Sequence, residues 1–326
     1  MRIFSGIKPT GSLTLGNYLG MIRPCVDLQQ EGQPLYFIAD LHALTILPDP
    51  STLRSDTFNV AAILLAAGVN PENSTLFLQS HRSEQAELCW IMECLVTVGE
   101  LNRMTQYKEK RGAEERTTGA GLFNYPALMA ADILLYQSQS VPVGEDQTQH
   151  VELARDLAKR FNNKYGETFV VPEVKIKKET ARIMGLDDPT KKMSKSTTSQ
   201  YHSILLTDDA ATVEKKIQKA VTDSGSDIEY SNDKPALKNL LDIFSGMTGE
   251  KPEDIAARSA GRGYAEFKRD LAQAITEHLT PLQERYAELR TDESTLSMIL
   301  RNGAEKVAPI AQDTLAKVYK KVGLVR

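Results

Sequence analysis

The sequence predicts an α/β protein in which a doubly wound parallel sheet is followed by an all-helical C-terminal domain. Short apolar strands alternate with helices in the first half of the chain, and strand signals disappear from residue 208 onward. Strands that alternate with helices of about 13 to 17 residues are typical of parallel sheets covered by helices. Such sheets bind ligands beyond the carboxyl ends of their strands. We therefore expect functional residues in the segments that follow the strands.

Three strand–helix units open the chain. The expected strands are residues 2–7, 35–39 and 75–78, and the helices that follow them are 14–30, 51–67 and 83–96. Asp49 and Ser51 can start the second helix and Gly68 can stop it. The candidate ligand segments are therefore residues 8–17, 40–45 and 79–82.

The middle of the chain continues this alternation after an interruption. Residues 101–121 are polar and rich in both charge signs, which favours a helix and then a flexible connection. An apolar helix at 122–137, a short strand at 140–143 and a helix at 146–162 follow. We expect this last strand to carry a further ligand segment at its end.

The C-terminal part reads as helices from residue 208 to 322. Breaks are expected near Gly225, Gly246, Gly261 and Pro281, because glycine and proline interrupt helices. The change of texture predicts a domain boundary between residues 190 and 205. The expected division is a sheet domain at 1–190, a junction at 191–205, a helical domain at 206–300 and a last helix at 301–326.

Composition excludes several classes of protein. The chain has 326 residues, of which 41% are hydrophobic and 25% charged, as in ordinary globular proteins. No apolar run reaches the roughly 18 residues of a membrane span, and the N-terminus carries no signal-peptide pattern. Cys25, Cys89 and Cys94 form no paired framework. We expect a cytoplasmic protein with no zinc, no iron–sulfur cluster and no other bound metal of its own.

Charge is unevenly placed along the chain. The formal net charge of −4 argues against a general nucleic-acid coat protein. Residues 301–326 nevertheless carry six Lys/Arg against two Asp/Glu. A local basic patch of this kind is what binding to a phosphate backbone requires.

Residues Lys192 to Ser196 read Lys-Met-Ser-Lys-Ser. Gly185 and Pro189 break any regular structure before them, so we place this stretch on an exposed loop. Ammonium groups such as those of Lys192 and Lys195 suit phosphate oxygens. The alternative is a solvated charge run, which is the common meaning of a basic loop.

A second phosphate segment is expected after the first strand. Gly16 and Asn17 stand at the start of a helix, where free backbone N–H groups and the helix dipole favour an anion. Gly16 permits close approach of a ligand. The alternative is that Asn17 only caps the helix. Together with the loop Lys192–Ser196, called the lysine loop below, this turn predicts a Rossmann-like nucleotide-binding domain.

The apolar helix at 122–137 contains a side chain that needs a reason. Tyr125, Met129 and Asp132 share one face, and Asp132 lies among apolar residues. A buried carboxylate costs several kcal/mol unless it is paired. It can be a structural ion pair or a cap. It can equally accept a hydrogen bond from a ligand N–H, such as that of an indole, with Met129 against the flat ring.

The segment after the strand at 140–143 is also a candidate. Gly144 permits close approach and Asp146 can accept hydrogen bonds from ribose hydroxyls. Gln147 and Tyr125 can hold an amino-acid ammonium. His150 is expected on a helix face rather than as a base.

These motifs together resemble a known family. Lys-Met-Ser-Lys-Ser is the signature loop of class I aminoacyl-tRNA synthetases. Thr14-Leu-Gly-Asn17 resembles the form that the His-Ile-Gly-His motif takes in the tryptophanyl-tRNA synthetases, and so does Tyr-Pro-x-Leu-Met-Ala-Ala-Asp followed by Gly-Glu-Asp-Gln. Lys8 departs from the glutamine of many bacterial members.

The resemblance implies two sets of binding residues, with Lys192, Ser194, Lys195 and Ser196 as the catalytic group. It places ATP against Lys8, Pro9, Thr10, Gly16, Asn17, Gly144, Glu145, Asp146, Ile183, Lys192, Met193, Ser194, Lys195 and Ser196. It places L-tryptophan against Phe4, His42, Tyr125, Met129, Asp132 and Gln147. Lys192 and Lys195 would bind the β- and γ-phosphates, and Mg²⁺ would arrive with ATP.

The implied reaction is activation of L-tryptophan with ATP and its transfer to tRNA(Trp). The resemblance also implies a homodimer, an anticodon-binding helical domain at 206–300, and a last helix that returns to the catalytic domain. The segment Leu88 to Leu95 is a candidate dimer interface or, equally, part of the core. The rival hypotheses are a tyrosyl relative, a small-molecule adenylyltransferase and a non-catalytic RNA-binding paralogue.

Overall fold

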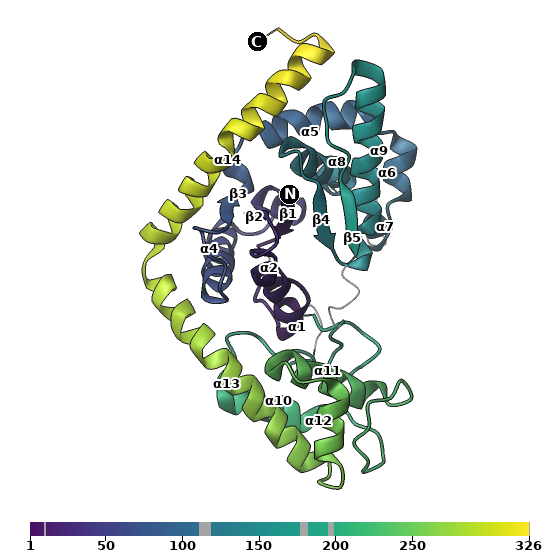
Figure 1. Cartoon of the computed structure of the whole chain (residues 1–326), viewed down its shortest axis with the longest axis vertical. Coiled ribbons are helices and arrows are strands. Elements are labelled where there is room, and N and C mark those ends of the chain that lie inside the picture. Colours follow the sequence, from purple (N-terminus) through teal and green to yellow (C-terminus); the bar gives the residue numbers. More distant parts are fainter. Residues whose placement is uncertain (10, 111–118, 177–181, 195–198, 326) are drawn as a thin grey trace.

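The computed structural model describes residues 1–9, 11–110, 119–176, 182–194 and 199–325. Five strands form one parallel sheet in the order β3-β2-β1-β4-β5 (Figure 1). The strands are β1 Arg2–Ile7, β2 Gln33–Ile38, β3 Thr75–Leu78, β4 Ser140–Val143 and β5 Glu173–Ile176. The doubly wound parallel sheet predicted from the sequence is therefore present.

The central strands are buried on both faces, as their apolar sequences require. β1 pairs with β2 from Arg2↔Gln33 to Ile7↔Ile38, so both strands end at the same level. Phe4 stacks on Phe37 with ring centroids 4.7 Å apart. The fifth strand was not predicted, because Glu173 and Lys175 interrupt its apolar pattern.

Helices cover both sides of the sheet and make up most of the remainder (Figure 1). The helices of the first half are α1 Leu15–Asn17, α2 Arg23–Leu28, α3 Asp40–Ala43, α4 Pro50–Ala66, α5 Glu84–Leu95, α6 Val98–Arg103, α7 Thr105–Lys110, α8 Ala120–Leu135 and α9 Thr148–Tyr165. Short 3₁₀ turns stand at η2 Leu44–Ile46, η3 Gln79–His81 and η5 Glu145–Gln147. Asp49 caps α4 through the N–H groups of Ser51 and Thr52, as the sequence predicts.

The first helix is not continuous as predicted. A π-helical turn, η1 Tyr18–Ile22, separates α1 from α2. Pro24 lies at the start of α2 and lacks the N–H group that a regular turn would use. The N–H group of Arg23 donates instead to the carbonyl of Tyr18, five residues back. The wide turn therefore absorbs the missing donor.

The second half is helical, but one predicted break is wrong. Its helices are α10 Ala210–Lys219, α11 Pro235–Thr248, α12 Pro252–Ser259, α13 Tyr264–Thr291 and α14 Glu293–Val322. Pro281 lies inside α13, where Leu279 and Leu282 are buried on either side of it. This packing outweighs the local cost of proline. The break comes at Asp292, whose side chain accepts from the N–H of Thr295 and caps α14.

The last helix straddles the edge strand of the sheet. Leu300 of α14 belongs to the hydrophobic core that contains Leu76 of β3. Ala304 and Val307 belong to the other core, which contains Phe77. Gly303 lies between them, where an added Cβ would stand 1.9 Å from the Leu76 carbonyl oxygen. Only glycine allows this contact, so α14 closes the β3 edge.

Among the described residues, no helix is both long and apolar enough to cross a membrane. The expected domain boundaries stay a prediction.

Candidate active site

The carboxyl ends of the parallel strands gather the predicted ligand segments at one edge of the sheet. The turn after β1 leads into α1 (Figure 1), α3 follows β2, η3 follows β3 and η5 follows β4. Residues far apart in the sequence therefore meet there, as the fold predicts.

A buried polar network surrounds Asp132 of α8. Asp132 is fully buried, and Gln79 Nε2 donates to both of its carboxylate oxygens at 2.8 and 3.0 Å. His42 Nε2 lies 2.8 Å from Asp132 Oδ2. Gln79 Oε1 accepts from the backbone N–H groups of Leu41 and His42 at 3.1 and 3.3 Å. One glutamine thus joins the ends of β2 and β3 to the carboxylate.

Sequence reasoning named Asp132 and His42, and it placed Gln79 in a candidate ligand segment without giving it a role. The available signal was a glutamine at the end of the apolar run Thr75-Leu-Phe-Leu, where a ligand segment begins. Gln79 is fully buried, so its amide needs partners on both sides. The paired state that the sequence left open for Asp132 is the one present here.

Aromatic and imidazole rings flank this network. The Tyr125 hydroxyl lies 2.6 Å from His150 Nε2, and its ring meets the edge of the His42 ring at 6.1 Å. Met129 is half-buried one turn before Asp132. Phe4 is a core residue, and its ring stacks between those of Phe37 and Tyr136. Of the predicted amino-acid pocket residues, His42, Tyr125 and Asp132 thus lie close together.

The turn before α1 is a reciprocal cap. The Asn17 N–H group donates to Thr14 Oγ1 at 3.2 Å, and the Thr14 N–H group donates to Asn17 Oδ1 at 2.9 Å. The capping role left open for Asn17 is therefore present. An added Cβ on Gly16 would stand 3.3 Å from Met193 Cβ and 3.6 Å from Ile183 Cβ. The glycine lets the helix start lie against the stem of the lysine loop.

The Lys8 side chain reaches the segment after β2. Its Nζ donates to Thr45 Oγ1 at 3.2 Å, and Thr45 Oγ1 donates to the His42 carbonyl at 2.8 Å. Pro9 is buried beside it, whereas Thr10 lies outside the described residues. Lys8 therefore connects the phosphate turn to the backbone of the histidine that contacts Asp132.

The described part of the lysine loop presents an exposed cation on a buried stem. Lys192 is exposed, while Ile183 and Met193 are each 2% exposed. The Met193 N–H group donates to the Ile183 carbonyl at 3.0 Å. Ser194 is half-buried. Lys195 and Ser196, the other two predicted catalytic residues, lie outside the described residues.

The segment after β4 is a tight turn. The Gln147 N–H group donates to the Gly144 carbonyl at 2.9 Å, and the Gln147 side chain donates to Asp146 Oδ2 at 2.8 Å. An added Cβ on Gly144 would stand 2.9 Å from Asp146 Oδ1. Glu145 starts the turn η5. This turn follows β4, at the carboxyl edge of the sheet.

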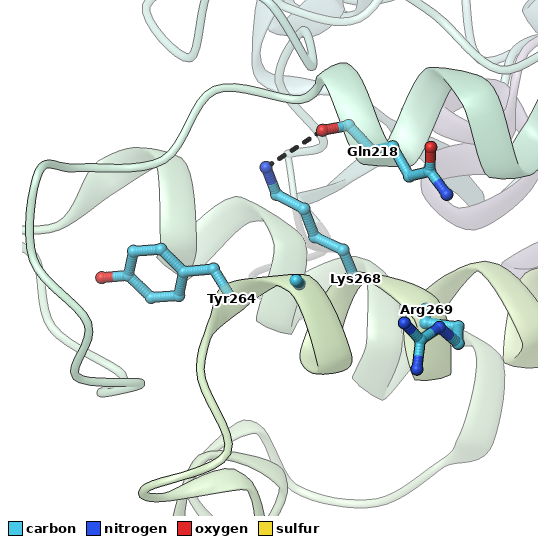
Figure 2. Close-up of a pocket in the computed structure, with 5 residues that line it drawn as sticks. Gln218, Tyr264, Lys268 and Arg269 are labelled. Carbon is cyan, nitrogen blue, oxygen red and sulfur yellow. Dashed lines mark hydrogen bonds between the residues drawn. The ribbon is translucent and has the colours of Figure 1, made fainter.

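Two cavities lie away from this edge. One of about 290 Å³ is lined by Gln218, Tyr264, Ala265, Lys268 and Arg269 of the helical half (Figure 2). The other, of about 220 Å³, lies between β3 and α14. Within the described ranges, no cluster of three His, Cys, Asp or Glu side chains could hold a metal ion.

A sequence model of the tRNA synthetases class I (W and Y) matches residues 1–280. The chain belongs to this family. Among relatives of the family, tryptophan–tRNA ligase of Clostridium perfringens is 50% identical over 99% of this chain and 97% of its own length. The ligase of Listeria monocytogenes serovar 1/2a is 51% identical over 99% of this chain and 98% of its own length.

Solved structures of the family agree with this placement. Tryptophanyl-tRNA synthetase of Mycoplasma pneumoniae is 37% identical with a TM-score of 0.92, covering 99% of this chain and 98% of that one. The Campylobacter jejuni enzyme, complexed with ADP and tryptophan, is 38% identical with a TM-score of 0.85, covering 99% and 100%. A tyrosyl-tRNA synthetase of Aeropyrum pernix is 19% identical and shares the fold. The Rossmann-like fold class is thereby confirmed.

Proposed function

We propose that this chain is a tryptophan–tRNA ligase. It activates L-tryptophan with ATP to tryptophanyl-adenylate and pyrophosphate, and then transfers tryptophan to the 3′ end of tRNA(Trp). The observation that carries this proposal is the buried Asp132 carboxylate, which Gln79 and His42 fix in place. It lies at the edge of the sheet formed by the carboxyl ends of the strands, called the ligand edge below. The high identity to tryptophan–tRNA ligases along nearly the whole chain supports it.

The carboxylate supplies the selectivity in this proposal. An indole N–H group only donates and an ionised carboxylate only accepts, with about four lone-pair positions on its two oxygens. Gln79 and His42 occupy three of them, which leaves room for one further donor. A substrate without that donor would leave a buried charge incompletely paired and would be rejected. Met129 packs against the ring, and Tyr125 with Gln147 holds the ammonium group.

The activation step needs charge placement rather than a base. The tryptophan carboxylate, with a pKa of about 3.5, is ionised at pH 7 and attacks the α-phosphorus in line as pyrophosphate leaves. Lys192 stabilises the charge that develops on the phosphates, with Lys195, Ser194 and Ser196 beside it and Lys8 as a further cation. Gly16 and Asn17 start the helix against which ATP lies. Its remaining contacts in this proposal are Pro9, Thr10, Gly144, Glu145, Asp146, Ile183 and Met193.

Mg²⁺ enters this proposal with the nucleotide. Carboxylate groups that could cage it are not clustered among the described residues. Bound to ATP, the ion would neutralise charge on the phosphates. The protein residues still have to position those phosphates for attack.

The helical half and the surface complete the proposal. Residues 206–300 bind the anticodon, and the basic end of α14 lies beside the sheet domain. The enzyme works in the cytoplasm as a homodimer. Trp90 and Val98 are 67% and 66% exposed, which favours an interface there. Leu88 and Met92 of the same predicted segment are fully buried, so that part of the segment is core.

Tryptophan-dependent ATP–pyrophosphate exchange tests the proposal, with tyrosine as the control amino acid. We expect exchange with tryptophan and little with tyrosine. Absence of exchange with both would remove the enzyme hypothesis. Exchange with tyrosine alone would assign the chain to the tyrosyl branch.

A further inference from the structure

A buried histidine lies under the lysine loop and is not among the residues assigned to the site. His202 is 2% exposed. Its Nδ1 lies 2.6 Å from Asp187 Oδ1 and its Nε2 lies 3.2 Å from the backbone carbonyl oxygen of Lys192. The ring therefore bridges a carboxylate to the residue that opens Lys-Met-Ser-Lys-Ser.

Both partners of the ring are hydrogen-bond acceptors. A backbone carbonyl accepts, and an ionised carboxylate accepts. Burial alone would raise the pKa of Asp187, but hydrogen bonds from Ser199 and His202 outweigh it and lower the pKa, which keeps the carboxylate ionised. The imidazole ring thus lies between two hydrogen-bond acceptors and joins them.

The surroundings hold the ring in this place. An added Cβ on Gly185 would stand 2.0 Å from His202 Cε1, so the ring lies directly on the glycine backbone. The His202 carbonyl accepts from the Leu186 N–H group at 3.0 Å. The Gly185 N–H group donates to the Lys191 carbonyl at 2.8 Å. The two stems of the loop are thus tied on either side of the ring.

The residues on either side of Lys192 are also held through the backbone. Lys192 lies opposite Met184 in an isolated antiparallel bridge, whose hydrogen bonds are made by Lys191 and Met193. Met184 is held in turn by Asn239 of α11, which accepts from its N–H group at 2.8 Å and donates to its carbonyl at 3.0 Å. The His202 side chain contacts the Lys192 carbonyl directly. The position of an exposed lysine side chain depends chiefly on the position of its backbone. The contact between His202 and the Lys192 carbonyl therefore affects where the Lys192 ammonium group lies.

We propose that His202, held by Asp187, is a positioning residue that fixes the Lys192 carbonyl and so aims the Lys192 ammonium group at the phosphates of ATP. This role rests on the proposed function, since it requires Lys192 to act on ATP. His202 does not touch the substrate; it acts through Lys192.

A double-mutant cycle tests this role, with His202→Gln, Lys192→Ala and the combination assayed by ATP–pyrophosphate exchange. A glutamine amide cannot contact both acceptors from opposite ends as the imidazole ring does. We expect His202→Gln to lower kcat/KM for ATP about 10-fold while KM for tryptophan stays within about twofold. In the Lys192→Ala background the same substitution should cost less than about twofold, because its target is gone.

Three further variants keep the outcome decisive. Gln200→Ala changes an exposed residue two positions away and should match the wild type. Gly185→Ala should reproduce the His202→Gln effect, because its methyl group displaces the ring. Asp187→Asn should give an intermediate loss.

The results separate the two proposals. A wild-type protein without tryptophan-dependent exchange overturns the proposed function. An active wild type in which His202→Gln leaves kcat/KM for ATP unchanged overturns the positioning role alone. If His202→Gln lowers kcat/KM for ATP equally with Lys192 present and with Lys192→Ala, the positioning role is also overturned, because the effect is then structural. The same conclusion follows if His202→Gln impairs the kinetic parameters for tryptophan and for ATP together.

Discussion

Asp132 and Lys192 each place one charge at the ligand edge, but by opposite means. Asp132 has no exposed surface, and side chains from two other segments contact its carboxylate directly. Lys192 is exposed, and its contacts with Met184 and His202 are made by its backbone. The buried charge is held by its own hydrogen bonds, whereas the exposed charge is held by the chain that carries it.

This difference separates stability from rate. A partner removed from a buried carboxylate leaves a charge that the interior cannot solvate, so unfolding becomes easier. A partner removed from beneath an exposed lysine leaves the charge in water, so stability changes little. Its cost should appear in the transition state, where geometry matters.

The largest effect is expected from Lys192→Ala. Removing a cation aimed at developing phosphate charge should lower kcat for ATP–pyrophosphate exchange about 10²- to 10³-fold. Because the side chain is exposed, the melting temperature should stay within about 2 °C. Exchange kinetics and thermal unfolding of the same preparation check both statements. A loss of stability as large as the loss of rate would contradict the contrast between the two charges.

Gln79→Met should be next in size, and should show the opposite pattern. It removes two hydrogen bonds from buried Asp132 and should lower the free energy of unfolding by about 2–4 kcal/mol. KM for tryptophan should rise, while KM for ATP should change little. Urea unfolding and exchange kinetics are the measurements. Gln200→Met on the exposed loop is the matched control, and an unchanged unfolding energy for Gln79→Met would refute the buried-network argument.

The ion pair between Glu100 and Arg160 involves neither Asp132 nor Lys192, and it predicts how stability depends on pH. Hydrogen bonds from Arg160 are the main reason why the pKa of Glu100 falls from 4.5 to about 2. Burial acts in the opposite direction, and hydrogen bonds from Thr97 lower the pKa further. Since the folded-state pKa is depressed, this stabilisation is present above about pH 4.5 and is lost as the pH falls toward 2.

At pH 7, Glu100→Gln should therefore lower the free energy of unfolding by about 1–2 kcal/mol, and the difference from the wild type should shrink at pH 3. Urea unfolding at the two pH values measures it. A difference that grows on acidification would show the sign to be wrong. Exchange kinetics at pH 7 should be unaffected, because Glu100 lies on α6 and outside the ligand edge.

The smallest effect is expected at Lys8, which is linked to Asp132 through Thr45 and His42. Its neutral partner Thr45 is half-exposed, so Lys8→Gln should cost less than about 1 kcal/mol in unfolding. KM for ATP should change by less than about fivefold. A change in KM for tryptophan of the same size would show that the loss of the Lys8–Thr45 contact alters, through His42, the position of Asp132. Titrating both substrates in the exchange assay decides this.

The sequence was most informative where a local pattern had a local cause. The parallel sheet follows from apolar strands such as Leu35-Tyr-Phe-Ile, and the α4 start follows from Asp49. The pairing of Asp132 was foreseen as one of two possibilities. Its partner Gln79 was not, because 53 residues separate them and only the fold brings them together.

The errors have physical causes as well. Pro281 breaks an isolated helix but not one packed by Leu279 and Leu282. β5 lacks an apolar pattern, and it forms a strand because its backbone pairs with that of β4. His202 carries no motif in its sequence neighbourhood. Its meaning appears only once the Lys192 carbonyl and Asp187 lie on either side of its ring.

The helix over the β3 edge has a consequence for synthesis. The ribosome completes β3, which ends at Leu78, about 244 residues before it completes α14, which ends at Val322. At ~5–20 residues per second this interval lasts roughly 12 to 50 seconds. During that interval the edge strand presents unpaired backbone groups and the apolar side chains that Leu300 and Val307 later cover. A nascent chain of this protein should therefore depend on chaperones until its final helix emerges, and Gly303→Val should prolong that dependence in the finished protein.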